Sequence, residues 1–241
     1  MSDAHGGGKR IAHEHADVTG GWLRPALFGA MDGLVSNLAL IAGVAGGTQD
    51  TGTHAVVLAG LAGLSAGAFS MAVGEYNSVA SQSEAAEHEV DKERREIEHN
   101  EAAEMAELAG MYVKKGLEPK LAQEVARQIH RDPETAVAVH AKEEFGIDPH
   151  DLASPMLAAG SSFVAFAIGA IIPVLPYLLG AGNIWPSMVF TLIALFAAGA
   201  MVTQVTSRAW WYGGLRMMVL GGGAAGITYL VGDLVGSSGL G

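Results

Sequence analysis

Long apolar runs alternate with polar segments along this chain. Each run has about 20 residues, the length that an α-helix needs to cross the hydrocarbon core of a bilayer. The pattern predicts five transmembrane helices, at residues 25–46, 55–79, 154–180, 186–207 and 212–234. We therefore expect an all-α integral membrane protein.

Proline and glycine modify this picture in two places. Pro173 and Pro176 interrupt the third run, IIPVLPYLL, and a proline inside a helix removes a backbone hydrogen bond and frees a carbonyl. We expect a kink there. Between the fourth and fifth runs, the sequence WYGG at residues 211–214 predicts a short turn.

A polar insert separates the second and third runs. The helix of the second run has no breaker after Tyr76 until Gly110, so we expect it to leave the membrane and to end near Gly116. Two shorter helices follow, at residues 118–130 and from Pro133 to Gly146. The predicted organisation is a three-helix insert set between membrane helices. Its segments are a polar tail at 1–24, spans one and two at 25–80, the insert at 81–152, and spans three to five at 153–241.

The distribution of positive charge predicts the orientation. All fourteen Lys and Arg residues fall on one side of the five-span arrangement. Cytoplasmic loops carry an excess of these residues, so that side is the cytoplasm. The N-terminal tail, which lacks the apolar core and cleavage site of a secretory signal, and the insert are expected to be cytoplasmic, and the C-terminus outside.

Negative charge is concentrated in the insert. The chain has a net charge of −11, and residues 81–152 hold eighteen Asp and Glu against nine Lys and Arg. An acidic surface argues against a nucleic-acid partner and suits cations. The chain has no cysteine, which excludes disulfides and thiolate metal sites.

Several carboxylates of the insert have a regular spacing. Glu93 and Glu96 are followed eleven residues later by Glu104 and Glu107, and eleven residues is close to three full turns, so we expect all four to project from one face of the helix. His140 and Glu144, four residues apart, form another pair that shares a face. Oxygen ligands with an imidazole suit Mn²⁺, Fe²⁺ and Zn²⁺. The alternative is a solvated acidic face, because other glutamates lie between these residues.

Carboxylates also lie inside the predicted spans. Asp32 is in the first span, and Met71 and Glu75 lie four residues apart on one face of the second. A charge inside a bilayer usually faces a partner, a cavity or a transported ion. These residues are candidates for a membrane site for a divalent cation; for Met71 alone, core packing is the alternative.

Three motifs resemble the vacuolar iron transporter family: MDGLVSNLALIAGVAGG in the first span, AGAFSMAVGEYNSVASQSE at the end of the second, and GAIIPVLPYLL in the third. The resemblance implies proton-coupled export of Fe²⁺, often with Mn²⁺, from the cytoplasm by a homodimer whose pathway lies at the subunit interface. By position it implies that Asp32 and Met71 match the membrane metal site. It also implies a cytoplasmic metal-binding module, with glutamates at Glu93, Glu96, Glu104, Glu107 and Glu144. His140 falls where the plant member of the family has a methionine, and Glu75 is added from its position alone.

The sequence therefore predicts a metal/proton antiporter of a bacterial plasma membrane, with no enzymatic activity and no cofactor apart from the bound or transported Fe²⁺, Mn²⁺ or Zn²⁺. Its partners are metal ions, protons, the lipid bilayer and a second copy of the chain. Two alternatives remain open, a passive divalent-metal channel and a membrane-anchored metal buffer or sensor. A di-iron oxidase is weaker, because such bundles use two Glu-x-x-His motifs and the insert has only Glu96 to His99.

Overall fold

The structure, a computed structural model, describes residues 21–48, 53–203 and 208–238, which form helices and connecting segments without any strand. The described helices, in chain order, are α1 (Leu23–Gly47), α2 (Thr53–Lys114), α3 (Pro119–Ile129), α4 (Pro133–Glu144), α5 (Pro155–Ile171), α6 (Leu175–Leu178), α7 (Trp185–Val202) and α8 (Trp210–Ser237). The predicted all-α class is confirmed.

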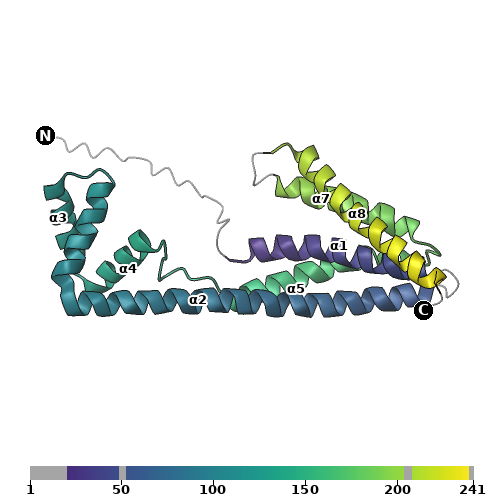
Figure 1. Cartoon of the computed structure of the whole chain (residues 1–241), viewed down its shortest axis with the longest axis horizontal. Helices are drawn as coiled ribbons and strands as arrows, with labels where there is room; N and C mark the ends of the chain where they lie inside the picture. The colour runs from purple at the N-terminus through teal and green to yellow at the C-terminus, as the bar shows by residue number, and fades with distance from the viewer. Residues whose placement is uncertain (1–20, 49–52, 204–207, 239–241) are drawn as a thin grey trace, which may run out of the picture.

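The molecule is elongated, and α2 runs through most of its length (Figure 1). At one end, the first part of α2 packs against α1, α5 and α6, and α7 and α8 pack on α1 to complete an apolar bundle. At the other end, the last part of α2 packs with α3 and α4. The second predicted span therefore continues without a break into the insert, as the sequence predicted.

Four of the described helices, α1, α2, α7 and α8, are long and apolar enough to cross a membrane. The third predicted span is divided. Helix α5 has 17 residues and ends at Ile171, and the short α6 follows from Leu175. The predicted interruption at Pro173 and Pro176 is confirmed, because the chain leaves the α-helical path between these two helices.

Asn37 joins three helices at this interruption. The carbonyl of Ala170 loses its usual helical donor, because the backbone N–H of Val174 bonds to Ile171 instead. The side-chain Nδ2 of Asn37, on α1, donates to Ala170 O at 2.6 Å and to Gly60 O of α2 at 3.1 Å. Asn37 is only 2% exposed. A buried carbonyl needs a partner, and this amide supplies it while fixing α1 against α2 and α5.

The turn predicted at residues 211–214 is wrong. Helix α8 begins at Trp210, so Gly213 and Gly214 lie inside its first turns. Their role is close packing: a Cβ atom at Gly213 would lie 2.5 Å from the carbonyl oxygen of Gly199 on α7. Small residues allow membrane helices to approach closely. A pair of glycines such as Gly213 and Gly214 can therefore indicate either a turn or a close helix contact, and here it is the helix contact.

The first helix of the insert is bent, which the sequence did not predict. Asn100 has the non-helical angles φ −149° and ψ 56°. The segment after it, residues 101–114, turns away from the line of α2 and lies beside α3 (Figure 1). Leu108 and Ala109 pack there against Ala122 and Ala126. The insert therefore has three parts: a stalk, which is α2 from residue 81 to Asn100; a hairpin, which is residues 101–114 together with α3; and α4. Helices α3 and α4 begin at prolines and lie where the sequence predicted them.

Candidate metal site

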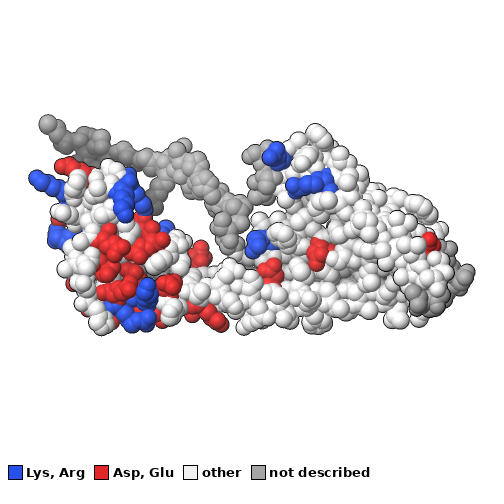
Figure 2. Space-filling model, in the orientation of Figure 1, with Lys and Arg blue, Asp and Glu red and all other residues white. Residues whose placement is uncertain are grey.

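Acidic side chains gather on the insert, whereas the surface of the helical bundle is mostly uncharged in the same view (Figure 2). Most of these carboxylates are exposed. A small group faces inward between α2 and α4, and this group forms the candidate site.

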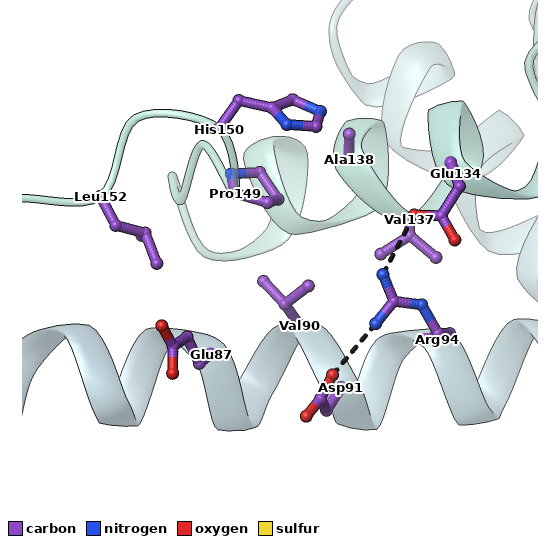
Figure 3. Close-up of a pocket in the computed structure, with 10 residues that line it drawn as sticks. All are labelled: Glu87, Val90, Asp91, Arg94, Glu134, Val137, Ala138, Pro149, His150 and Leu152. Atoms are coloured by element: carbon purple, nitrogen blue, oxygen red, sulfur yellow. Dashed lines mark hydrogen bonds and ion pairs between the residues drawn. The ribbon is translucent and has the colours of Figure 1, made fainter.

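Ion pairs and apolar contacts hold α4 against the stalk of α2. The guanidinium of Arg94 bonds to Asp91 on its own helix and to Glu134 at the start of α4, both at 3.0 Å (Figure 3). Beside these pairs, Val90 and Val137 pack together in the core of the insert. Because α4 is fixed at this point, its later residues have a defined position over α2.

Four side chains converge further along this interface. Glu93, Glu104, His140 and Glu144 each offer a ligand atom, and these atoms all lie within 4.8 Å of one another. The Nδ1 atom of His140 is 2.9 Å from Glu93 Oε1 and 3.1 Å from Glu144 Oε1. An octahedral ion with bonds of about 2.1 Å holds adjacent ligand atoms about 3 Å apart. The spacing and the donor types suit a first-row divalent cation.

Burial sets the electrostatics of this group. The side chains of His140 and Glu93 are 0% and 2% exposed. His140 Nε2 is buried without a hydrogen-bond partner. Burial, followed by the carboxylates of Glu144 and Glu104, raises the pKa of Glu93 to about 7, and burial also raises the pKa of Glu104. The site therefore holds more negative charge than its surroundings can stabilise, and a cation would relieve this repulsion.

Glu96 and Glu107 lie near the group but outside it. Their carboxylates help to raise the pKa of Glu93. Glu96 also lies 3.9 Å from the Nζ of Lys92, and both side chains are about half exposed. The structure thus brings four of the six predicted insert residues into one cluster and leaves these two at its edge.

The bend at Asn100 is what brings Glu93 and Glu104 together. On one straight helix, a rise of 1.5 Å per residue would separate positions eleven residues apart by about 16 Å along the axis. The prediction of one straight helix face is therefore wrong, although both residues belong to the cluster. The spacing of four between His140 and Glu144 does act as expected, because α4 is regular there.

The membrane residues line a separate cavity. Its volume is about 180 Å³, and Asp32, Asn37 and Met71 are among the residues that line it, together with Phe166 of α5. The hydroxyl of Ser36 donates to Asp32 Oδ1 at 2.6 Å. Asp32 and Met71 thus line the same cavity, whereas Glu75 is not among its lining residues. A metal site formed by these residues stays a prediction.

The structure adds one residue to each site that the sequence analysis did not name: Ser36 in the membrane cavity and His130 beside the cluster of the insert. Ser36 lies four residues after Asp32, so the helical repeat could have indicated it. His130, at the end of α3, is 6% exposed, and its ring centroid lies 5.2 Å from that of His140 at an interplanar angle of 84°. No sequence pattern links these two histidines, because their contact depends on how α3 and α4 are folded over α2.

Comparison with known proteins gives the family. A profile described as the VIT family matches residues 23–233. The chain belongs to the VIT family. A protein of Acanthamoeba castellanii named vacuolar iron transporter is 36% identical over 225 residues, 90% of this chain and 76% of the relative. Vacuolar iron transporter 1 of Arabidopsis thaliana is 31% identical over 194 residues, 78% of this chain and 76% of the relative.

A protein of Oryza sativa named vacuolar iron transporter 2 is 27% identical over 225 residues, 91% of each chain. The family match covers both the apolar bundle and the insert. With four long apolar helices among its described residues, this VIT family member is an integral membrane protein of a transporter family, which is not a class of enzymes.

Proposed function

We propose that this protein exports a divalent metal, Fe²⁺ and also Mn²⁺, from the cytoplasm in exchange for protons. One observation carries the proposal: a chain of the VIT family holds three carboxylates and an imidazole within 4.8 Å of one another on its insert. Relatives named vacuolar iron transporters support iron as the cargo. Zn²⁺ would fit the same donor atoms.

In this proposal the two sites act in sequence. The insert, on the cytoplasmic side, captures the cation and raises its local concentration. Asp32 and Met71 then bind it inside the bundle. Protonation of the Asp32 carboxylate from the far side of a bacterial plasma membrane weakens binding and releases the metal. The interrupted segment between α5 and α6 would serve as the moving element, since broken helices commonly take this part in alternating access.

Five spans and a homodimer are part of the same proposal. Counting α5 and α6 as one interrupted span gives five crossings and puts the C-terminus outside. Asp32 is exposed on the single chain. An exposed carboxylate in a membrane helix is unfavourable, so we propose that a second copy covers this face.

The test is metal flux into proteoliposomes that contain the purified protein, with and without an imposed pH gradient. We expect gradient-dependent uptake of Fe²⁺ and Mn²⁺ that is lost in Asp32→Ala and kept in the control Glu98→Ala, an exposed glutamate of the stalk. Metal flux that is the same with and without the pH gradient would indicate a channel. Metal binding without flux would indicate a buffer or sensor.

A further inference from the structure

His130 is a buried residue that the proposed transport function does not use. Its ring packs against His140 from the end of α3. Its Nδ1 lies 2.9 Å from the carbonyl oxygen of Ala126, and a carbonyl can only accept, so Nδ1 carries the proton. The other ring nitrogen, Nε2, is therefore a lone-pair acceptor, and it is buried without a partner. Buried polar atoms of this kind are uncommon in folded proteins.

His140 has the same unpaired atom. Its Nδ1 faces the carboxylates of Glu93 and Glu144, so in the metal-free protein Nδ1 is the donor and Nε2 carries a lone pair. Nε2 is also buried without a partner. Two neighbouring imidazoles thus present two acceptors, which cannot bond to each other.

Metal binding would remove this mismatch. A cation held by Glu93, Glu144 and the Nδ1 of His140 requires a lone pair on Nδ1, so the proton of the neutral imidazole moves to Nε2. The Nε2–H then becomes a donor on a ring whose centroid lies 5.2 Å from that of His130, the ring that carries the free acceptor. Histidines that bind metals usually donate their second N–H in this way, which fixes the ring and strengthens the ligand.

We infer that His130 is a positioning residue of the insert's metal site: it accepts the Nε2–H of His140, directly or through one buried water, when Nδ1 holds the cation. The inference rests on the proposed metal-binding role of the insert. Two unpaired atoms in the metal-free protein become one hydrogen bond in the metal-bound protein. His130 therefore favours the bound state without touching the metal.

The test measures Mn²⁺ affinity of the full-length protein in detergent, in an Asp32→Ala background that removes the membrane site. Free Mn²⁺ is followed by electron paramagnetic resonance. We expect His130→Phe, which keeps a ring but removes both nitrogens, to weaken binding 10- to 100-fold, the usual loss for such a partner. His130→Gln should recover most of the affinity, because its amide can donate to Ala126 and its oxygen can accept from His140.

The matched control is His99→Phe. His99 makes the same bond to a carbonyl four residues back, from Nδ1 to Arg95 O at 2.6 Å, but it is exposed and lies outside the cluster. This change should leave Mn²⁺ binding unaltered. Thermal unfolding in EDTA gives a second readout, where His130→Phe should melt at or above the temperature of the parent because an unpaired buried nitrogen has been removed.

The possible results separate the two proposals. If the parent binds no Mn²⁺ in the Asp32→Ala background, both the insert site and this inference are overturned. If the parent binds and His130→Phe binds within twofold of it, only the role of His130 is overturned. A loss in His130→Phe that His130→Gln does not recover, with a lower melting temperature in EDTA, would show ordinary packing and also overturn the inference.

Discussion

Glu93 differs from the other glutamates of the stalk in its burial. It is 2% exposed and its Oε1 lies 2.9 Å from His140 Nδ1, whereas Glu98, five residues on, is exposed. A carboxylate removed from water favours its protonated form unless an opposite charge lies nearby. Within the cluster its neighbours include two more carboxylates and one imidazole. A proton and a metal ion are therefore alternative ways to neutralise the same group.

The pH dependence of metal binding follows from the pKa of Glu93. Its pKa is raised from 4.5 to about 7, so the folded, metal-free protein holds a proton that the unfolded chain releases between these values. This group's contribution to the free energy of unfolding is present below about pH 4.5 and is lost as pH rises to 7. Metal binding requires the carboxylate, so Mn²⁺ affinity of the insert should rise up to tenfold per pH unit toward pH 7 and then level off.

The measurement is a set of Mn²⁺ titrations between pH 5.5 and 8 on the Asp32→Ala protein. Adding Glu93→Gln should lower the Mn²⁺ affinity and reduce the increase of that affinity with pH below pH 7. Glu98→Gln should change neither the affinity nor its pH dependence. An affinity that stays constant from pH 5.5 to 7 in the Asp32→Ala protein would contradict the assignment of the raised pKa to a ligand.

At the scale of elements, close helix crossings determine the geometry of the membrane cavity. Helix α1 lies against α5 so tightly that backbone meets backbone at Gly33, next to Asp32. Asn37 then ties α1 to the interrupted end of α5. The position of Asp32 relative to Met71 thus depends on how α1 packs against its neighbours as well as on the residues of the cavity.

A methyl group at this crossing should destabilise the bundle. A Cβ atom at Gly33 would overlap the carbonyl oxygen of Phe166 and lie 2.8 Å from the backbone nitrogen of Ala170. Overpacking of this kind costs about 1–3 kcal/mol. Gly33→Ala should therefore lower the melting temperature of the detergent-solubilised protein, measured by circular dichroism.

Gly160→Ala is the matched control on the partner helix. Gly160 lies in α5, where an added Cβ would meet nothing within 4 Å. Alanine is the better helix former by about 1 kcal/mol, so this variant should melt at or above the parent temperature. Equal losses in the two variants would argue against a close crossing at Gly33.

At the scale of the whole molecule, α2 connects the two candidate sites. It carries Met71 beside the membrane cavity and Glu93 in the insert. These residues are 22 positions apart, which is about 33 Å along a helix. Each site is completed by residues of other elements: Asp32 of α1 in the bundle, and His140 of α4 in the insert.

The orientation of this arrangement can be tested with single cysteines, because the chain has none of its own. Gly110 in the insert and Gly182 between α6 and α7 are exposed, and an added side chain would meet nothing within 4 Å at either. With five spans, a membrane-impermeant maleimide should reach Gly182→Cys in intact bacterial cells. Gly110→Cys should react only after the cells are opened.

Ser237→Cys, near the end of α8, supplies the control for the span count. It should behave like Gly182→Cys, because α7 and α8 cross the membrane as a pair between them. If the α5–α6 segment does not cross the membrane, both positions lie on the same side as Gly110, and all three cysteines would react only in opened cells. That result would replace the five-span proposal with four spans.

The sequence by itself determined the features that depend on neighbours along the chain. Apolar runs predicted the long helices because a membrane helix is defined by its length and composition. Prolines marked the break after Ile171 and the starts of α3 and α4, since proline lacks a backbone donor. The pairing of His140 with Glu144 followed from the helical repeat.

Tertiary structure decided the features that depend on packing between distant segments. The bend at Asn100 lets residues 101–114 bury Leu108 against α3, and this brings Glu104 beside Glu93. The same packing places His130 against His140. The contact of Glu93 with Glu104 and that of His130 with His140 both depend on the path of the chain after Asn100. That path is fixed by the free energy gained when the apolar core of the hairpin is buried, and the spacing of residues along one helix does not report it.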